Sequence, residues 1–187
     1  MKLIHSSFFA RDTIKVAPEL LGKVISVNGT LARIVETEAY GQDHASHAFK
    51  RTERSALMYD TFGHIYVYLI YGMYNCLNFT TEKEGIPGAV LIRAVEPLNN
   101  FEEMQLIRKT NQLTNLCSGP GKLCQALRIN NTLNGLELGG KIKIYDDGFS
   151  DFEIETSSRI GIKNSLELQW RYFIKDNWFV SKVKIKS

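Results

Sequence analysis

The sequence contains no long apolar run. A helix that crosses a membrane needs about 20 mostly apolar residues, and no segment of the 187-residue chain is of that kind. The first residues also lack an apolar stretch followed by a small-residue cleavage site, so no secretory signal is predicted. We therefore expect an intracellular protein that does not associate with membranes.

Cysteine is scarce as well, with three residues in the chain. Cys76, Cys117 and Cys124 are odd in number and include no Cys-x-x-Cys pair, so neither a disulfide framework nor a thiolate metal site is predicted. The four histidines do not complete a metal-binding pattern with them. We therefore expect no metal centre, and we interpret Cys117 and Cys124 as helix-packing residues.

Charge of one sign is not in large excess, because 23 basic residues face 20 acidic ones and the net charge is +3. The distribution is uneven, since basic residues outnumber acidic ones after Ser158. A basic segment can follow a polyanion such as nucleic acid, although a solvated terminus is the simpler interpretation of the charge alone. The basic residues concerned are Arg159, Lys163, Arg171, Lys175, Lys182, Lys184 and Lys186.

The chain does have enough apolar side chains to bury a core, with 44% hydrophobic and 11% aromatic residues. Most predicted elements are alternating strands. Asn28-Gly29 predicts the turn of a first hairpin, and Tyr71 lies near the tip of a second. The predicted strands are 23–27, 31–40, 64–71, 74–80, 88–95, 141–145 and 152–156, with a last hairpin formed by 170–174 and 178–180. The predicted helices are 12–21, 52–59, one that begins at Asn99 or Asn100, and 118–127.

The order of these elements predicts an α+β fold. The length favours a single domain over residues 1–187, with two small domains as the weaker alternative. We expect a mainly antiparallel curved sheet with flanking helices and a protruding β-hairpin.

Two glutamates interrupt the predicted strand 33–40. Alternate residues of a strand share a face, so Ile34, Glu36, Glu38 and Tyr40 are predicted to lie on one side. One carboxylate could activate a water or stabilise a cation, provided that it lies within hydrogen-bond reach of its proton. Both could instead pair with basic neighbours such as Lys23 or Arg33 across strands, and for two glutamates alone that pairing is the simpler interpretation.

Tyrosines are frequent near these glutamates. Flat rings with polar tips suit stacking on a planar ligand such as a nucleobase, although aromatic residues on strands more often pack in the core. Tyr71, next to Gly72 at a hairpin tip, could enter a base stack or fold back on its own hairpin. The cluster consists of Tyr40, Tyr59, Phe62, Tyr66, Tyr68, Tyr71 and Tyr74.

Three further features could carry chemistry. The segment 43–47 contains His44 and His47, either of which could carry a proton, although a surface histidine usually has no such role. Arg93 lies in an apolar strand and needs a carboxylate partner, for which Glu36, Glu38 and Glu96 are the candidates. The run 118–122 could grip a phosphate through backbone N–H groups and Lys122, or could simply begin a helix; it is not a P-loop.

Taken together, these segments resemble the alkyladenine (3-methyladenine) DNA glycosylase family. The matching motifs occur in the right order over nearly the whole chain. They are 33–40 (RIVETEAY), 45–48 (ASHA), 65–78 (IYVYLIYGMYNCLN), 90–97 (VLIRAVEP) and 117–127 (CSGPGKLCQAL).

The resemblance implies a monofunctional enzyme that removes alkylated or deaminated purines from double-stranded DNA and leaves an abasic site. Glu38 matches the general base that activates water, and Arg93 matches an arginine beside that water. The family uses no metal and no cofactor, and we expect a monomer. A carboxylate beside the sugar also suits a transition state with oxocarbenium character.

The resemblance also implies roles in binding. Tyr40, His47 and Tyr68 match the pocket that holds the flipped base, and Asn78 matches the residue that crowds this pocket against the amino group of guanine. Tyr71 matches the residue that fills the gap left in the duplex. We further expect Gly119, Gly121 and Lys122 to contact phosphate, the contact that the run 118–122 suggests.

The chain departs from the family pattern in the run 52–55, at Gln169 and at Trp178, so contacts to the DNA backbone there are expected to differ. Two other functions remain open from the residues. One is a catalytically silent nucleic-acid binding module, which would gain nothing from a carboxylate beside the phosphates. The other is a small sugar-binding or glycoside-hydrolysing protein that uses Glu36 and Glu38 as an acid–base pair.

Overall fold

The computed structural model describes residues 1–182, and in this part of the chain nine strands form one antiparallel sheet. The order of the main path is β1-β7-β2-β3-β6-β5-β4, and β9 joins the sheet through β3 with β8 beyond it. The strands are β1 (Lys2–Leu3), β2 (Val24–Val27), β3 (Thr30–Tyr40), β4 (Ile65–Ile70), β5 (Tyr74–Thr80), β6 (Ala89–Pro97), β7 (Ile142–Asp146), β8 (Ile154–Ser157) and β9 (Arg171–Ile174).

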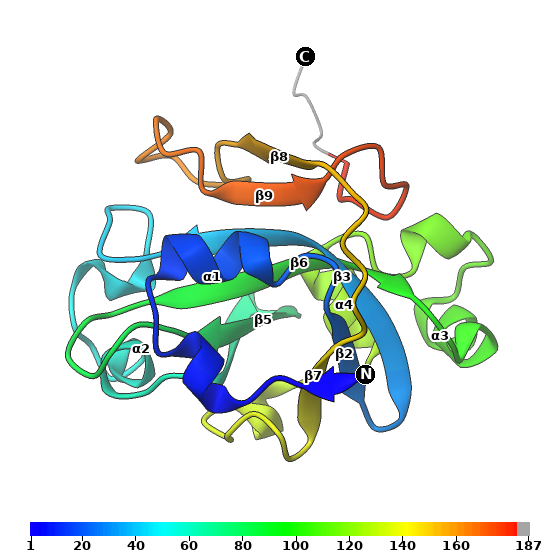
Figure 1. Ribbon diagram of the computed structural model, residues 1–187, viewed down its shortest axis with the longest axis horizontal. Coiled ribbons are helices and arrows are strands. Elements are labelled where there is room, and N and C mark those ends of the chain that lie inside the picture. The colour runs from blue at the N-terminus through cyan, green and yellow to red at the C-terminus, as the bar shows by residue number, and fades with distance from the viewer. Residues whose placement is uncertain (183–187) are drawn as a thin grey trace.

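In the described part of the chain, four short α-helices flank the sheet. Helix α1 lies across β3 and β6, and α3 lies at the far end of the molecule (Figure 1). The main core packs between the sheet, α1 and α4. The helices are α1 (Thr13–Glu19), α2 (Ala56–Asp60), α3 (Phe101–Arg108) and α4 (Pro120–Ala126), with 3₁₀ turns at Ser6–Phe9, His47–Phe49, Leu113–Asn115 and Asn131–Leu133. The α+β class and the mainly antiparallel sheet predicted from the sequence are confirmed.

Strand β3 organises the molecule because it has different partners along its length. Its first half pairs with β2 and its second half with β9, while β6 lies along its other edge. The register against β6 shifts on both sides of Glu36, so that Val35 is an extra residue in β3 and Arg93 is an extra residue in β6. Such bulges re-aim side chains. The alternation predicted from Ile34 is therefore interrupted, since Ile34 packs in the main core whereas Glu36 bonds to Arg93.

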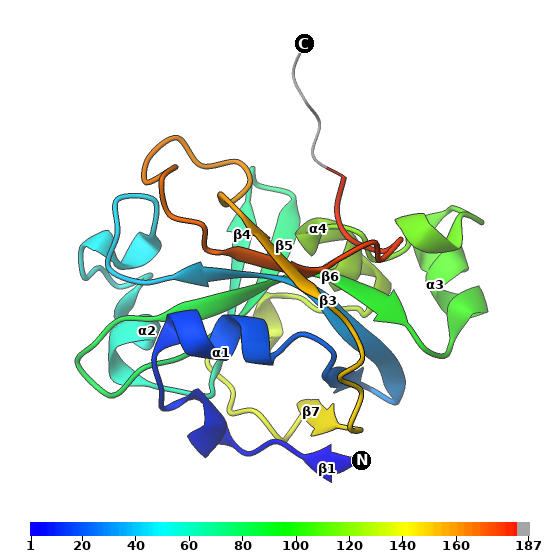
Figure 2. The same cartoon turned by 45° about the horizontal axis from the view of Figure 1, so that its top comes forward.

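The hairpin formed by β4 and β5 protrudes from the sheet and rises near the loop between β8 and β9 (Figure 2). Its tip turns through two successive residues with positive φ, Tyr71 at 53° and Gly72 at 69°. Met73 N–H donates to Ile70 O at 3.2 Å and closes the turn. Both angles are those of a type I′ turn, which matches the twist of the flanking strands. Tyr71 thus lies at the tip, as predicted.

Local sequence features account for several predicted ends. The Asp12 side chain accepts a hydrogen bond from Ile14 N–H at 2.8 Å and caps α1, and Asn28 and Gly29 have the positive φ values of a hairpin turn. The helix predicted at 52–59 is shorter, because residues 52–55 form a turn. Asn100 stands at the N-cap of α3, but its side chain donates to the Thr30 hydroxyl and caps nothing.

The predicted last hairpin is wrong. Strand β9 pairs with β8 and β3, and residues 178–180 are not a strand. The chain turns after β9 through Asp176, whose φ is 56°, and Val180 N–H donates to Asn177 O at 3.2 Å. This turn carries Ser181 back to Glu36 instead of along β9.

Among residues 1–182, no helix is long and apolar enough to span a membrane. In the same part of the chain, no group of three or more His, Cys, Asp or Glu side chains could hold a metal ion. Lys184 and Lys186 of the predicted basic segment lie outside the described residues.

Candidate active site

A pocket of about 320 Å³ opens where several segments of the chain meet. They are the end of β3, the segment 45–54, α2, the β4–β5 hairpin, the start of β6 and the loop at 160–162. A pocket of this size lies at the small end of the range for small-molecule sites. Its wall brings together five of the residues predicted for the site: Tyr40, His47, Tyr68, Tyr71 and Asn78.

Glu38 lies immediately behind the Tyr40 side of this wall and is fully buried. Its Oε2 accepts a hydrogen bond from the Tyr40 hydroxyl at 2.7 Å, and its Oε1 accepts one from Ile160 N–H at 2.7 Å. Arg93 Nη1 lies 3.2 Å from the same Oε1. Because each carboxylate oxygen has two lone pairs, Oε2 can still accept a further donor such as water. Glu38 is thus held in one orientation and keeps capacity to accept a proton.

Arg93 joins the two glutamates of β3. Its Nε donates to Glu36 Oε1 at 3.0 Å while its Nη1 faces Glu38. Burial alone would lower the pKa of Arg93, but the charges of Glu38 and Glu36 outweigh burial, so its pKa lies above the ordinary value. The predicted carboxylate partner is confirmed, and there are two of them.

The alternative partners proposed for the glutamates are engaged elsewhere. Lys23 pairs with Asp146 at 2.7 Å, and Arg33 pairs with Asp147 at 2.8 Å. Both pairs lie away from the pocket, near the start of β3. Glu36 and Glu38 therefore bond to Arg93 and not to these basic residues.

Four tyrosines and a histidine form the aromatic part of the wall. The His47 ring lies edge-on to Tyr68, with ring centroids 4.6 Å apart, and Tyr40 and Tyr68 pack against the small core cluster around Met58. Burial, followed by the charge of Glu38, raises the pKa of Tyr40 far above its usual value, and burial does the same for Tyr68. Both hydroxyls therefore stay protonated, and the Tyr40 proton is already donated to Glu38.

His47 stands in the pocket as a neutral imidazole. Its Nδ1 lies 3.0 Å from the Tyr66 hydroxyl. Loss of hydration among the neighbouring rings, assisted by the positive charge of Arg54, lowers the pKa of His47 to about 4. Arg54 itself lies over the Tyr68 ring, with its guanidinium carbon 5.0 Å from the ring centroid. The cation of this wall is therefore Arg54 and not His47.

Asn78 is fixed in the floor of the pocket. Its Nδ2 donates to Tyr66 O at 3.0 Å and to Cys76 O at 3.3 Å. The side chain is almost fully buried, so these bonds satisfy a group that would otherwise be costly to bury. Its position in the wall is therefore rigid.

Comparison with known proteins gives the family. Residues 7–178 match the sequence profile of methylpurine-DNA glycosylases. The chain belongs to the methylpurine-DNA glycosylase family. A relative from Clostridium novyi, named "Putative 3-methyladenine DNA glycosylase", is 46% identical over 97% of this chain and 100% of its own length. Relatives of the same name from Alkaliphilus oremlandii and Methanocella arvoryzae are 46% and 43% identical, each over 97% of this chain and 100% and 97% of their own lengths.

In this member of the methylpurine-DNA glycosylase family, the hairpin tip presents apolar side chains to solvent. Tyr71 is 79% exposed, and Leu69, Met73 and Tyr74 beside it are also exposed. Adjacent exposed apolar side chains commonly mark an interaction surface. The tip lies at the mouth of the pocket, because Leu69, Ile70 and Tyr71 belong to its wall.

The residues predicted to contact phosphate lie outside the pocket, at the start of α4. Lys122 Nζ donates to Asn115 Oδ1 and lies 3.4 Å from the Ser118 hydroxyl. At Gly121, an added Cβ would stand 3.0 Å from Cβ of Tyr74, so the close packing of α4 on the hairpin favours glycine there. Gly119, with a φ of 153°, precedes the helix. Gly121 thus supports the hairpin, and phosphate contact by these residues stays a prediction.

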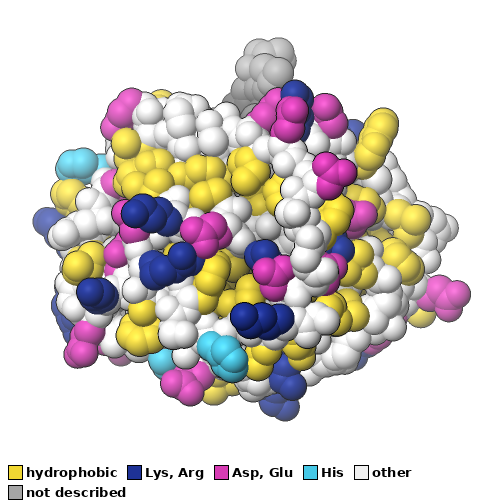
Figure 3. Space-filling model, in the orientation of Figure 1, with side chains coloured by type: hydrophobic (Ala, Val, Ile, Leu, Met, Phe, Trp, Pro, Cys, Tyr) yellow, Lys and Arg dark blue, Asp and Glu magenta, His cyan; other side chains and the backbone are white. Residues whose placement is uncertain are grey.

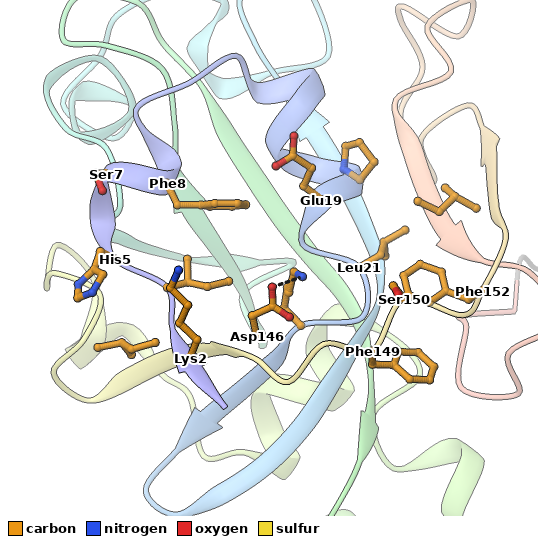
Figure 4. Close-up of a pocket in the computed structure, with 15 residues that line it drawn as sticks. Lys2, His5, Ser7, Phe8, Glu19, Leu21, Asp146, Phe149, Ser150 and Phe152 are labelled. Atoms are coloured by element: carbon orange, nitrogen blue, oxygen red, sulfur yellow. Dashed lines mark hydrogen bonds and ion pairs between the residues drawn. The ribbon is translucent and has the colours of Figure 1, made fainter.

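A second pocket, of about 670 Å³, lies between the N-terminal segment and the chain that follows β7 (Figure 4). Its aromatic side includes Phe149 and Phe152, whose rings stack at 5.4 Å, and its charged side contains the Lys23–Asp146 pair. It contains none of the predicted site residues. On the face of Figure 3, basic and acidic side chains are interspersed, and the described residues there form no continuous basic surface. We therefore assign the site to the tyrosine-lined pocket.

Several residues of the site were not predicted. Arg159 bonds Asp43 through both terminal nitrogens at 2.7 and 3.0 Å, and its guanidinium carbon lies 4.7 Å from the Tyr40 ring centroid. In the sequence, Arg159 stands out only as one of the basic residues after Ser158. Arg54 was noted only as part of a departure from the family pattern, and the role of Ile160 N–H depends on a backbone group that no side-chain pattern reports.

Proposed function

We propose that the protein flips alkylated or deaminated purines out of double-stranded DNA and hydrolyses their N-glycosidic bond, leaving an abasic site. Membership of the family supports a glycosylase that acts on alkylated bases. The observation that supports base flipping and hydrolysis in particular is the fixed, buried carboxylate of Glu38 beside a tyrosine-lined pocket. A silent nucleic-acid binding module would have no use for that carboxylate.

In the proposed reaction, Glu38 accepts a proton from a water as the water oxygen attacks C1′ of the sugar. The bond between C1′ and the purine nitrogen breaks, and its electron pair leaves with the base. A purine methylated at N3 of adenine or N7 of guanine is already cationic and leaves as a neutral base. A neutral purine such as hypoxanthine leaves as an anion, which then takes up a proton from water. The carboxylate also stabilises the positive charge that develops on the sugar, while Arg93 orients Glu38 through its Nη1.

The aromatic wall is proposed to hold the flipped base. Tyr40 and Tyr68 offer ring faces to a planar, often cationic, purine, and neutral His47 offers a hydrogen-bonding edge. Asn78, fixed by two backbone carbonyls, would crowd the amino group of normal guanine. Discrimination by a rigid obstacle is effective, because a misplaced polar group in a buried site loses its hydrogen bonds.

The hairpin tip is proposed to fill the space that the base leaves in the duplex. Tyr71 is more exposed than Leu69 beside it at the mouth of the pocket, and it can enter the minor groove. Gly119, Gly121 and Lys122 would contact a phosphate from the start of α4, beside the hairpin. We expect the protein to act on DNA as a monomer, without a metal or cofactor.

The proposal is tested with duplexes that carry 3-methyladenine, 7-methylguanine, hypoxanthine or ethenoadenine, and with an undamaged duplex as control. Base release is read as strand cleavage at abasic sites after alkaline treatment. We expect cleavage of at least one damaged duplex and none of the control. Binding of damaged DNA without cleavage of any duplex would instead identify a silent binding module.

His47 is expected to act without changing its charge in the physiological range. Because its pKa is about 4, it is neutral at neutral pH and gains a proton only as the pH falls toward 4. His47→Gln should therefore slow base release by the same factor at about pH 6 and at about pH 8. Single-turnover rates across this range measure the factor. If the wild-type rate of base release instead changed with pH near the ordinary histidine pKa, and this change were absent in His47→Gln, His47 would not act as a neutral group.

A further inference from the structure

Four charged side chains meet in the interior behind the pocket. Glu36, Glu38, Arg93 and Arg171 are each at most 7% exposed. Two carboxylates face two guanidinium groups, so the cluster is neutral when all four are ionised. Charges as deeply buried as these are stable only when each has partners of the opposite sign.

Glu36 has the densest set of bonds in this cluster. Its Oε1 accepts hydrogen bonds from Arg93 Nε at 3.0 Å, Arg171 Nε at 2.6 Å and the Ser181 hydroxyl at 2.8 Å. Its Oε2 accepts one from Ser181 N–H at 2.7 Å. Glu36 does not belong to the pocket wall. Any effect of Glu36 on the reaction must therefore pass through its partners.

Arg93 is the partner that reaches the catalytic carboxylate. It uses Nε on Glu36 and Nη1 on Glu38, and it is the extra residue of the β6 bulge, where the strand register alone does not fix its direction. A guanidinium that is free to turn tends to bind a single carboxylate through two parallel bonds. With Nε held by Glu36, Arg93 offers Glu38 only one of its terminal nitrogens.

We propose that Glu36 is a positioning residue, which holds Arg93 so that an oxygen of Glu38 stays free to take the proton of the attacking water, and which ties β9 and Ser181 to this arrangement. This inference rests on the proposed glycosylase function. Without the Glu36 charge, Arg93 would turn fully onto Glu38 and occupy the oxygen that must accept a proton. The charged form of Glu38 would then be favoured more strongly, and Glu38 would be a weaker base.

A change in the basicity of Glu38 can be detected in a pH profile, because the other titratable groups that face Glu38 are uncharged near neutral pH. Tyr40 on β3, Tyr68 on β4 and Cys76 on β5 surround it, and burial raises the pKa of all three, so they carry no charge near neutral pH. Ile160 contributes only a backbone N–H. The charge next to Glu38 is Arg93, with Glu36 and Arg171 behind it.

The decisive variant is Glu36→Gln, which keeps the shape of the side chain and removes its charge. We expect single-turnover base release to slow about tenfold at neutral pH. In the profile of this rate against pH, the loss of activity on the acid side (the acid limb) should move to lower pH by about half a unit or more, because a like charge near Glu38 is lost. Affinity for damaged duplex should change less than about twofold, since Glu36 does not reach the pocket.

The matched control is Asp147→Asn. It removes the carboxylate partner of Arg33, at the other end of β3 and outside the pocket, and should leave the rate and the limb unchanged. If Glu36→Gln does not fold, Glu36→Asp is the alternative test. It keeps the negative charge, but its shorter side chain moves the carboxylate away from Arg93. Slower release with intact binding and a lowered acid limb supports the proposal, and a wild-type rate or an unshifted limb overturns it.

The possible results distinguish a failure of the Glu36 positioning role from a failure of the proposed glycosylase activity. An active wild type with an unshifted limb in Glu36→Gln overturns the positioning role alone. A slower variant with an unshifted limb also overturns it, because a purely structural loss lowers the rate without changing the protonation of the base. A wild type that releases no base from any damaged duplex overturns both.

Discussion

Replacing Glu38 with glutamine is expected to abolish base release while leaving the binding of damaged duplex largely intact. A glutamine keeps the size of the side chain and its hydrogen bond from Ile160 N–H, but it cannot accept the proton of the attacking water. Loss of a positioned general base costs about 10²- to 10⁴-fold in rate. The variant also removes a negative charge beside the developing oxocarbenium ion, so the upper part of this range is expected.

The measurement is a single-turnover assay with enzyme in excess over a duplex that carries one damaged purine. Binding is measured in parallel by titration of the same duplex. Glu96→Gln is the matched control, because Glu96 is also a strand glutamate but bonds to Asn177 outside the pocket. Unchanged base release by Glu38→Gln would remove Glu38 from the mechanism.

Features of the fold that depend on adjacent residues could be predicted from the sequence. Asn28-Gly29 and Tyr71-Gly72 both occupy turns that need positive φ. Two adjacent residues are enough to indicate such a turn. Asp12 likewise caps α1 by a bond to a residue two positions away. The partner of Arg93 could be predicted for a different reason. A buried guanidinium requires a carboxylate, and few carboxylates lay within apolar strands.

Contacts between distant segments could not be predicted. Ser181 bonds to Glu36, Arg159 bonds to Asp43, and Ile160 N–H bonds to Glu38. In each case the two residues are more than 100 positions apart, and the later one lies in irregular chain after β8. No periodicity marks such residues, because nothing in their own segment decides which strand they will meet.

The same limit explains the wrong last hairpin. The aromatic residues near 178–180 are typical of a strand, and their sequence position beside β9 favours a hairpin. The structure uses this segment differently, because the turn after β9 brings Ser181 to a buried carboxylate that already holds two guanidinium groups. Satisfying Glu36 thus decides the course of the chain here, and strand propensity does not.

The second large effect is expected at the hairpin tip. Tyr71→Ala should weaken binding of damaged duplex and slow base release by about 10- to 100-fold together, because stacking of one aromatic ring on bases contributes about 1 to 3 kcal/mol. The ring is 79% exposed in the free protein and touches little of its own fold, so its removal should not change thermal stability. Tyr71→Phe keeps the ring and should retain most of the affinity.

Leu106→Ala is the matched control for this surface change. Leu106 is exposed to nearly the same extent, 78%, but lies on α3 and not at the pocket. Fluorescence of 2-aminopurine placed beside the damaged base reports flipping directly, because unstacking raises its emission. If Tyr71 fills the gap in the duplex, Tyr71→Ala reduces this change while Leu106→Ala does not. Equal affinity, equal flipping and equal rate in Tyr71→Ala would mean that the hairpin tip rests against the DNA without entering it.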